Sequence, residues 1–344
     1  METGLLAAAL MLLSAVACTK EESPLSAKPP AYDSSGFAKG ADVSWITEME
    51  KAGRKFYDAA GSEVECMALL RSLGMNAIRL RVWVNPASGW CSKEETLVKA
   101  IRAHQLGMRL MIDFHYSDWW ADPGQQTIPE AWKEMTLEEM TQAVKVHTIA
   151  TLELLKANGI TPEWVQVGNE TGNGMCWPLG QADVSMANYV ALNNAGYDAV
   201  KSVFPNAGVI VHLQGGDNSN LYRWLFDGLK KNGGKWDIIG MSLYPSPDSW
   251  QEMNARCMAN ASDMINRYGT KVMICEVGMS WDKPEASKAF LADIISQAKN
   301  IADDKCLGVF YWEPQSYGSW NGYTMGAFDN DGKPTIALDA FKGN

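Results

Sequence analysis

The sequence predicts a single α/β domain in which eight parallel strands close into one (β/α)8 barrel, the TIM barrel. Two observations support this prediction. Eight short apolar runs alternate with longer helical patterns from residue 37 onward, and most of these runs are nearly continuous in Val, Ile, Leu and Met. Such composition is typical of parallel strands that helices cover. The 344 residues also fit one barrel of this class, which routinely reaches about 250 residues or more.

The apolar runs are the expected strands, and helical stretches separate most of them. The expected strands are Phe37–Trp45, Asn76–Val84, Met108–His115, Trp164–Asn169, Gly208–Leu213, Trp236–Tyr244, Lys271–Glu276 and Leu307–Trp312. The expected helices are Glu63–Leu73, Lys93–Leu106, Leu137–Ala157, Val184–Val203, Leu221–Lys231, Trp250–Tyr268, Glu285–Ala302 and a short last one at Ile336–Phe341. Gly or Asn-Gly follows the first three helical stretches directly, which predicts where those helices end.

The main structural alternative is an open, doubly wound sheet. Such a sheet usually carries a Gly-rich phosphate loop after its first strand. Here Ile46-Thr-Glu-Met49 follows the first expected strand, so the barrel is the favoured architecture.

The first 36 residues have the composition of export and tether segments. The apolar run from Leu5 to Ala17 is too short to span a bilayer comfortably but suits a signal peptide. Small residues before Cys18 resemble a bacterial lipoprotein box, although an ordinary signal peptide with a chance cysteine is the alternative. We expect a lipoprotein-type signal peptide at 1–17, lipid on Cys18, a flexible tether at 18–36 and a catalytic barrel at 37–344. The protein would then be exported, as an outer-membrane or cell-surface lipoprotein of a Gram-negative bacterium with no other membrane attachment.

Charge and motif content exclude several classes of partner. The chain has 30 Lys and Arg against 40 Asp and Glu, a net charge of −10, and no basic cluster of five or more residues. Tight binding to nucleic acid through its phosphates is therefore not expected. No C-x-x-C or H-E-x-x-H motif is present, so we predict no metal and no cofactor. Cys275 and Cys306 fall inside apolar runs and are expected to be buried free thiols. We also expect a monomer.

Tryptophan is unusually abundant, with 14 Trp against 9 Phe and 11 Tyr. The flat apolar face of Trp suits a protein core, and it also suits stacking against sugar rings. Eight of the tryptophans fall at or just after expected strand ends. We predict that these eight line a sugar-binding cleft: Trp45, Trp83, Trp119, Trp120, Trp177, Trp281, Trp312 and Trp320.

Two carboxylates end apolar strands, Glu170 after the fourth strand and Glu276 after the seventh. In a barrel of this class the active site lies at the carboxyl ends of the strands, so these two side chains can face each other across its mouth. A pair of carboxylates flanking one bond is what glycoside hydrolysis needs. Asn169 is placed to bind a sugar hydroxyl, and Arg79 is placed to keep Glu276 ionised, because a nearby cation favours the charged form.

Other reaction classes have less support. A Ser-His-Asp site stays open as an alternative, but no G-x-S-x-G motif supports it. Of the four histidines, His104 and His147 fall in helical patterns and are expected to face outward. Asp329-Asn-Asp-Gly332 resembles the start of a calcium loop, but no Glu closes it at the twelfth position, so we expect a surface turn.

Five segments resemble glycoside hydrolase family 53, the arabinogalactan endo-β-1,4-galactanases. They are Asn76-Ala-Ile-Arg-Leu-Arg-Val-Trp-Val-Asn-Pro86, Asp113-Phe-His-Tyr-Ser-Asp-Trp-Trp-Ala-Asp-Pro123, Val167-Gly-Asn-Glu170, Ser242-Leu-Tyr-Pro245 and Phe310-Tyr-Trp-Glu-Pro314. The resemblance covers about residues 37 to 341. It implies a clan A barrel, retaining chemistry and cleavage inside the β-1,4-galactan of pectin side chains.

The resemblance also implies roles for individual residues. Glu170 matches the acid/base and Glu276 the nucleophile. The matching sugar-binding or nucleophile-contacting positions are Arg79, His115, Trp120, Asn169, Tyr244 and Trp312, with Trp83 as a further cleft residue. One departure concerns the loop after the seventh strand, where several bacterial members carry a calcium site. Here Val277–Pro284 is short, so we expect that site to be absent.

Two alternatives to a galactanase stay open from the sequence. The first is another clan A β-glycanase, a mannanase or cellulase, which would share both glutamates but not the substrate. The second is a non-catalytic glycan-binding lipoprotein. The presence of both glutamates argues against the second alternative, because a binding protein has no need of the pair.

Overall fold

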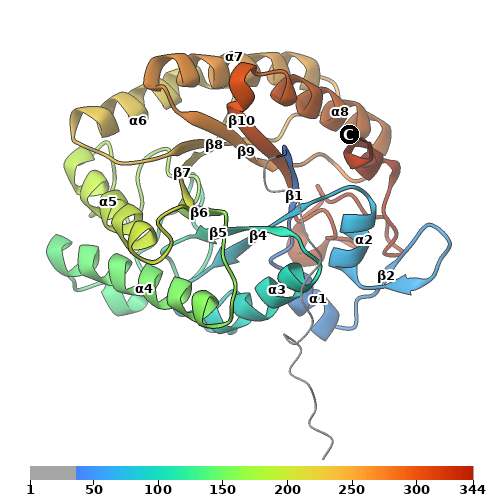
Figure 1. Ribbon diagram of the computed structural model, residues 1–344, viewed down its shortest axis with the longest axis horizontal. Helices are drawn as coiled ribbons and strands as arrows, with labels where there is room; N and C mark the ends of the chain where they lie inside the picture. Colours follow the sequence, from blue (N-terminus) through green and yellow to red (C-terminus); the bar gives the residue numbers. More distant parts are fainter. Residues whose placement is uncertain (1–35, 344) are drawn as a thin grey trace, which may run out of the picture.

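The computed structural model describes residues 36–343, and its centre is a closed barrel of eight parallel strands (Figure 1). In barrel order the strands are β1 (Ala38–Asp42), β4 (Ala77–Val82), β5 (Arg109–Phe114), β6 (Trp164–Val167), β7 (Gly208–Leu213), β8 (Ile238–Leu243), β9 (Lys271–Val277) and β10 (Cys306–Trp312). Asp42 of β1 pairs with Arg79 of β4 and with Trp312 of β10, which closes the ring. The predicted (β/α)8 barrel is confirmed. The signal peptide and nearly all of the tether predicted before it lie outside the described residues.

Helices surround the barrel and bury one face each against the strands (Figure 1). They are α1 (Ile46–Lys51), α2 (Cys66–Ser72), α3 (Lys93–Gln105), α4 (Leu137–Ala157), α5 (Met186–Val203), α6 (Ser219–Lys231), α7 (Trp250–Tyr268) and α8 (Pro284–Lys299). Short 3-10 turns occur at Glu130–Trp132, Ala302–Asp304, Trp320–Gly322 and Ile336–Phe341. Between residues 36 and 343, no helix combines the length and the apolar composition needed to cross a membrane.

Local side-chain contacts explain where the helices begin and end. The helix predicted from Glu63 begins only at Cys66, because the Glu65 side chain accepts the backbone N–H of Ala68 as a cap. Residues Glu63–Val64 (β3) instead pair antiparallel with Phe56–Tyr57 (β2), a hairpin that the sequence pattern did not predict. The last predicted helix is a 3-10 helix, and the one predicted to reach Ala302 ends at Lys299.

The orientation predicted for His147 is wrong. Its ring is half-buried and packs against Phe114, Tyr116 and Trp132. It lies beside Val144 and Thr148 on the inner part of α4, where an imidazole fills space between aromatic rings. His104, on α3, is also half-buried.

The amino-terminal half of the barrel interior is an apolar plug. Nine buried side chains form it: Ala38, Ala77, Met111, Trp164, Ile210, Ile238, Met273, Cys275 and Phe310. Gly40 makes room for it, since a Cβ at this position would lie 2.2 Å from the Phe310 ring. Beyond this plug, toward the carboxyl ends of the strands, lie buried polar side chains that include Arg79, Asp113 and Gln166.

All six cysteines in residues 36–343 are buried and free, which confirms the expectation for Cys275 and Cys306. Residues Asp329–Gly332 form the expected turn, because Asp329 Oδ1 accepts the N–H groups of Asp331 and Lys333. Within the described part of the chain, no group of three His, Cys, Asp or Glu side chains is arranged to hold a metal ion.

Candidate active site

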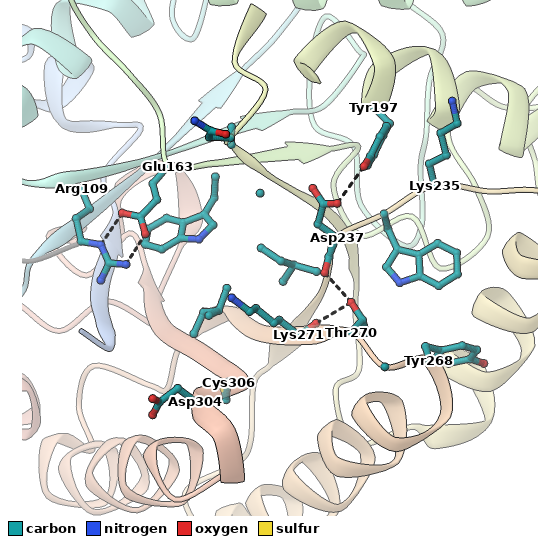
Figure 2. A pocket seen from close by; sticks show the side chains of 18 of the residues that line it. Arg109, Glu163, Tyr197, Lys235, Asp237, Tyr268, Thr270, Lys271, Asp304 and Cys306 are labelled. Carbon is teal, nitrogen blue, oxygen red and sulfur yellow. Dashed lines mark hydrogen bonds and ion pairs between the residues drawn. The ribbon is translucent and has the colours of Figure 1, made fainter. Parts of the chain in front are cut away.

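Two large cavities lie at opposite ends of the barrel. The larger, about 1270 Å³, is at the amino ends of the strands (Figure 2). Several of its charged side chains pair with each other, such as Arg109 with Glu163 and Lys201 with Asp237. The smaller, about 610 Å³, is at the carboxyl ends and contains both Glu170 and Glu276. Catalytic groups in barrels of this class lie at the carboxyl ends, so the smaller cavity, hereafter the cleft, is the candidate active site.

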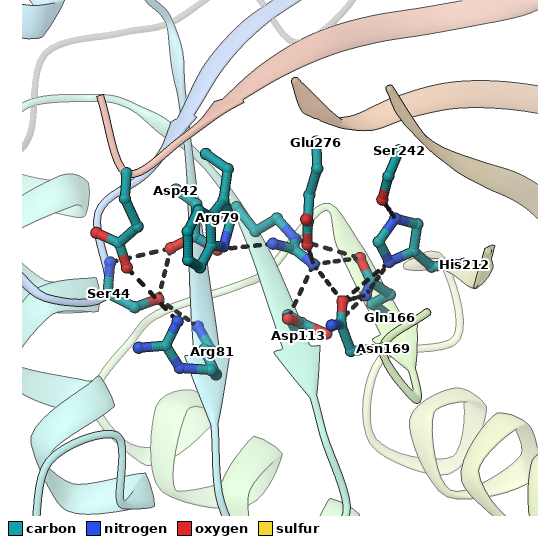
Figure 3. A network of polar contacts seen from close by, with 12 residues as sticks. Asp42, Ser44, Arg79, Arg81, Asp113, Gln166, Asn169, His212, Ser242 and Glu276 are labelled. Carbon is teal, nitrogen blue, oxygen red and sulfur yellow. Dashed lines mark hydrogen bonds and ion pairs between the residues drawn. The ribbon is translucent and has the colours of Figure 1, made fainter. Parts of the chain in front are cut away.

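Arg79 is the centre of a buried polar network beneath the cleft (Figure 3). Its guanidinium lies 2.8 Å from a carboxylate oxygen of Asp42, 2.9 Å from one of Asp113 and 2.8 Å from one of Glu276. The Arg79 side chain is fully buried, so it lies under the cleft wall and contacts Glu276 from below. One positive charge cannot neutralise three carboxylates. The carboxyl groups therefore repel one another, which tends to raise their pKa values, while Arg79 tends to lower them.

The groups of this network differ in the direction of their pKa shifts. Burial alone would raise the pKa of Asp113, but Arg79 and His115 outweigh burial and the net shift is downward. Burial lowers the pKa of the Arg79 guanidinium, but the three carboxylates raise it by more. The net shift is upward, so Arg79 stays charged. The Arg79 cation therefore faces Asp113 as an anion, whereas the net shift of the Glu276 pKa is upward.

Glu276 has two donors on its carboxyl group. Arg79 contacts one oxygen and the Tyr244 hydroxyl donates to the other at 2.8 Å. Burial raises the pKa of Glu276 to about 7, against the lowering effects of Arg79 and Tyr244. Both contacts favour the carboxylate, which is the form a nucleophile needs.

Glu170 follows Gly168 in a turn with unusual backbone conformation. Gly168 has φ +82° and Glu170 has φ +46°, a region that non-glycine residues rarely adopt. The Glu170 N–H points to His212 Nδ1 at 3.4 Å, which anchors this turn to β7. Burial and the neighbouring Glu276 raise the pKa of Glu170 to about 8. Arg79 and Tyr244 bond to Glu276 and not to Glu170, so the geometry favours the proton on Glu170 and the charge on Glu276.

The other predicted sugar-contacting side chains lie in the cleft wall: His115, Trp120, Asn169, Tyr244 and Trp312. The Asn169 amide is held on both sides, because its oxygen accepts from Arg79 at 2.9 Å and its nitrogen donates to the Ala121 carbonyl at 2.8 Å. His115 is engaged at both ring nitrogens as well. Nδ1 accepts the Ala121 N–H at 3.1 Å, so Nε2–H donates to Asp113 at 3.1 Å.

Aromatic rings form one wall of the cleft, with Trp120 at their centre. Its ring centroid lies 5.3 Å from that of Trp83, 5.6 Å from Trp45 and 5.8 Å from Trp312. The buried guanidinium of Arg81, which also lines the cleft, lies 4.1 Å from the centroid of the Trp120 ring in a cation–π contact.

The prediction for the tryptophans is only partly right. Five of the eight line the cleft, namely Trp45, Trp83, Trp119, Trp120 and Trp312, whereas Trp177, Trp281 and Trp320 do not. The N–H of Trp177 bonds to the Asn173 carbonyl at 2.8 Å, and Trp320 lies under Arg54 at 5.7 Å. Trp90 lines the cleft but was not among the eight. Loop positions after a strand end do not reveal which way a ring turns.

Residues outside the predicted set complete the network. Gln166, in the middle of β6, accepts from Arg79 and donates to Asp113 at 2.7 Å. Glu313 lies 3.5 Å from Arg81, and burial together with Asp42 raises its pKa to about 8. The only sequence signal for Gln166 is an amide inside the apolar run Trp164–Val167, where a polar side chain needs a buried partner.

A closed parallel barrel with two titrating glutamates facing an aromatic cleft at the carboxyl ends of its strands defines the class of glycoside hydrolases. The chain belongs to glycosyl hydrolase family 53, whose family model matches residues 38–341. The chain is 30% identical to the endo-beta-1,4-galactanase of Bacillus subtilis, over 81% of this chain and 70% of the relative. It is 29% identical to the probable arabinogalactan endo-beta-1,4-galactanase A of Neosartorya fischeri, over 80% and 83%.

A solved structure supports the same assignment. In a study of two fungal beta-1,4-galactanases, the matched chain is 26% identical, with a TM-score of 0.82 over 90% of this chain and 100% of that chain. The expected family and fold are therefore confirmed, and the chain is a member of an enzyme family.

Proposed function

We propose that the protein is a retaining endo-β-1,4-galactanase that cleaves galactan or type I arabinogalactan. The observation that supports this most directly is the pair Glu170 and Glu276 in one cleft, with Arg79 and Tyr244 bonded to Glu276. The printed activities of the family relatives favour galactan as the substrate. In this proposal Glu170 is the acid/base and Glu276 the nucleophile.

The reaction proceeds in two displacements. The Glu276 carboxylate attacks the anomeric carbon while Glu170 gives its proton to the glycosidic oxygen, so the bond to the leaving sugar breaks and a glycosyl ester forms on Glu276. Water then attacks the anomeric carbon, its proton passes to Glu170, and the ester bond to Glu276 breaks. Glu170 lacks the contacts with Arg79 and Tyr244 that favour the ionised form of Glu276, which suits its role as the acid in the first step. Once Glu276 is an ester, its negative charge is lost and the pKa of Glu170 falls, which suits the second.

The cleft wall supports a polysaccharide as the substrate. We propose that His115, Trp120, Asn169, Tyr244 and Trp312 surround the sugar ring that is attacked, with Arg79 acting through Glu276 from beneath. Trp120 and Trp312 are partly exposed in the cleft, so their apolar faces are available for stacking. The remaining alternative is another clan A β-glycanase that acts on mannan or cellulose.

The substrate proposal predicts hydrolysis of potato or lupin galactan with no comparable activity on mannan or cellulose. Reducing-sugar release measures this directly. Proton NMR of the first products should show the β-anomer before mutarotation, because two displacements retain configuration. Activity on mannan alone would refute the choice of substrate, and an α-anomer appearing first would refute the two-step mechanism.

We also propose that the protein is an exported monomer, attached by lipid on Cys18 to the outer membrane or cell surface of a Gram-negative bacterium. The sequence before residue 36 is the support for export and lipidation. Cells that produce the full chain should incorporate labelled palmitate into it, and the Cys18→Ser variant should lose the label and appear in the soluble fraction. Equal labelling of the two proteins would contradict lipidation at Cys18.

A further inference from the structure

Arg81, on β4, carries a buried positive charge that no hydrogen bond stabilises. The residue is only 1% exposed, and none of its three guanidinium nitrogens has a hydrogen-bond partner among residues 36–343. The Glu313 carboxylate lies 3.5 Å from one of these nitrogens, which is longer than an ordinary hydrogen bond. A buried charge without such partners is costly, so another contact must compensate for it.

Tryptophan rings surround the Arg81 guanidinium instead. Its central carbon lies 4.1 Å from the ring centroid of Trp120, 4.9 Å from that of Trp83 and 5.8 Å from that of Trp45. A cation within about 6 Å of an indole ring is attracted to its face, most strongly where water is excluded. Trp45 and Trp83 are buried, whereas Trp120 is partly exposed in the cleft. The nearest of the three rings is therefore the one that a sugar can reach.

The Trp120 ring has little else to fix its position. It belongs to the loop after β5 and makes no hydrogen bond within the part of the chain that the structure describes. The Trp83 ring, by contrast, donates its N–H to His115 at 3.4 Å. Arg81 is anchored in the barrel, because its backbone N–H donates to Ser44 Oγ at 2.8 Å. The contact thus connects a loop side chain to a fixed strand.

We propose that Arg81 is a positioning residue that holds the Trp120 ring in place for stacking against the sugar. Arg81 lines the cleft, but its guanidinium nitrogens are buried, so a sugar meets the Trp120 ring and not the charge. The charge therefore strengthens substrate binding through the ring and takes no part in the two displacements. This inference rests on the sugar contact of Trp120 in the proposed function.

The first test compares Arg81→Met with the wild-type enzyme on galactan. Met keeps a long apolar side chain but removes the charge, so KM should rise by about tenfold while kcat changes by less than about twofold. Arg81→Lys restores a charge and should return KM toward the wild-type value. A fall in kcat with an unchanged KM would overturn the proposal.

Arg109→Met is the matched control. Arg109 is also buried, and its guanidinium lies 4.4 Å from the Trp164 ring centroid in the same kind of contact. Both residues line the cavity at the amino end of the barrel, away from the cleft. We expect this variant to keep the wild-type KM and kcat.

A double-mutant cycle determines whether Arg81 acts through Trp120. Trp120→Ala should raise KM by itself. Adding Arg81→Met to Trp120→Ala should then change KM by less than about twofold, because the ring that the charge holds is already gone. Two effects that multiply would mean that Arg81 acts independently of the ring, and the proposal would fail.

A readout without substrate separates this inference from the proposed function. Fluorine-19 NMR of protein labelled with 5-fluorotryptophan observes the ring directly, with Trp120→Phe to assign its signal. The Trp120 signal should broaden or split in Arg81→Met, because an unsupported ring takes more than one position, and should stay single in Arg109→Met. This result supports the inference even if galactan proves not to be the substrate, whereas a single sharp signal in Arg81→Met overturns it. If Arg81→Met does not fold, Arg81→Gln also removes the charge and must change KM and the signal in the same direction.

Discussion

Glu276→Gln is expected to lower the hydrolysis of galactan by at least about a thousandfold, because the amide cannot form the glycosyl ester on which both displacements depend. The measurement is kcat/KM by reducing-sugar release. Glu163→Gln is the matched control, since Glu163 is a half-buried glutamate of an ion pair at the amino end of the barrel, far from the cleft. We expect the control to keep nearly full activity.

The same substitution should not weaken the fold. The pKa of Glu276 is about 7 in the folded protein, above its ordinary value, so the folded state binds a proton that the unfolded chain releases at lower pH. Stability contributed by this group is therefore present at low pH and lost as the pH rises through about 7. Gln cannot ionise, so Glu276→Gln does not lose this stability at high pH. Arg79 keeps its contacts with Asp42 and Asp113. We expect its melting temperature to equal or exceed that of the wild type at pH 8, with the difference vanishing near pH 4.

A less stable Glu276→Gln protein at pH 8 would contradict this account of the network. It would mean that the ion pair between Arg79 and the ionised Glu276 contributes more than burial of the carboxylate costs. Activity above about one tenth of the wild-type value, with the fold intact, would remove Glu276 from the nucleophile role.

Glu170→Ala is expected to show a different pattern. Galactan hydrolysis should fall by about a thousandfold or more, because the sugar leaving group needs a proton. The first displacement on an activated aryl β-galactoside should continue, because that leaving group departs without one. The glycosyl ester should then accumulate, since no base activates water. The measurement is a burst of phenol followed by a slow steady state.

Azide distinguishes the two roles by stereochemistry. In Glu170→Ala, azide attacks the ester on Glu276 without needing a base, so the rate should recover and the product should be the β-galactosyl azide. In Glu276→Ala, azide takes the place of the missing nucleophile and the product should be the α-anomer. If the anomers appear the other way round, the roles of Glu170 and Glu276 are exchanged.

Much of the fold followed from the sequence because its strands are local apolar runs. Gly208–Leu213 and the helices Leu137–Ala157 and Trp250–Tyr268 begin and end where predicted. Their limits come from local chemistry, such as the capping box between Thr136 and Glu139. The hairpin Phe56–Tyr57 with Glu63–Val64 was missed, because two-residue strands are too short to show alternation.

The sequence identified some residues of the candidate site and missed others. Polar residues at strand ends are visible in a sequence, and this pattern indicated Glu170, Glu276 and Asn169. Gln166 was missed because it lies inside a strand and resembles a core position. His147 was misplaced because a helical pattern gives the angle of a side chain only relative to its own helix.

The sequence by itself determined the barrel, the family and the identities of the two candidate catalytic glutamates. All three depend on residue types at fixed positions along the chain. The tertiary structure decided the rest: that Arg79 contacts Asp42, Asp113 and Glu276 together, that the Glu170 N–H donates to His212, and that five of the eight selected tryptophans face the cleft. These contacts join strands and loops that are distant in the chain. The physical reason is that pKa values and ring orientations depend on distances through space, which no local pattern contains.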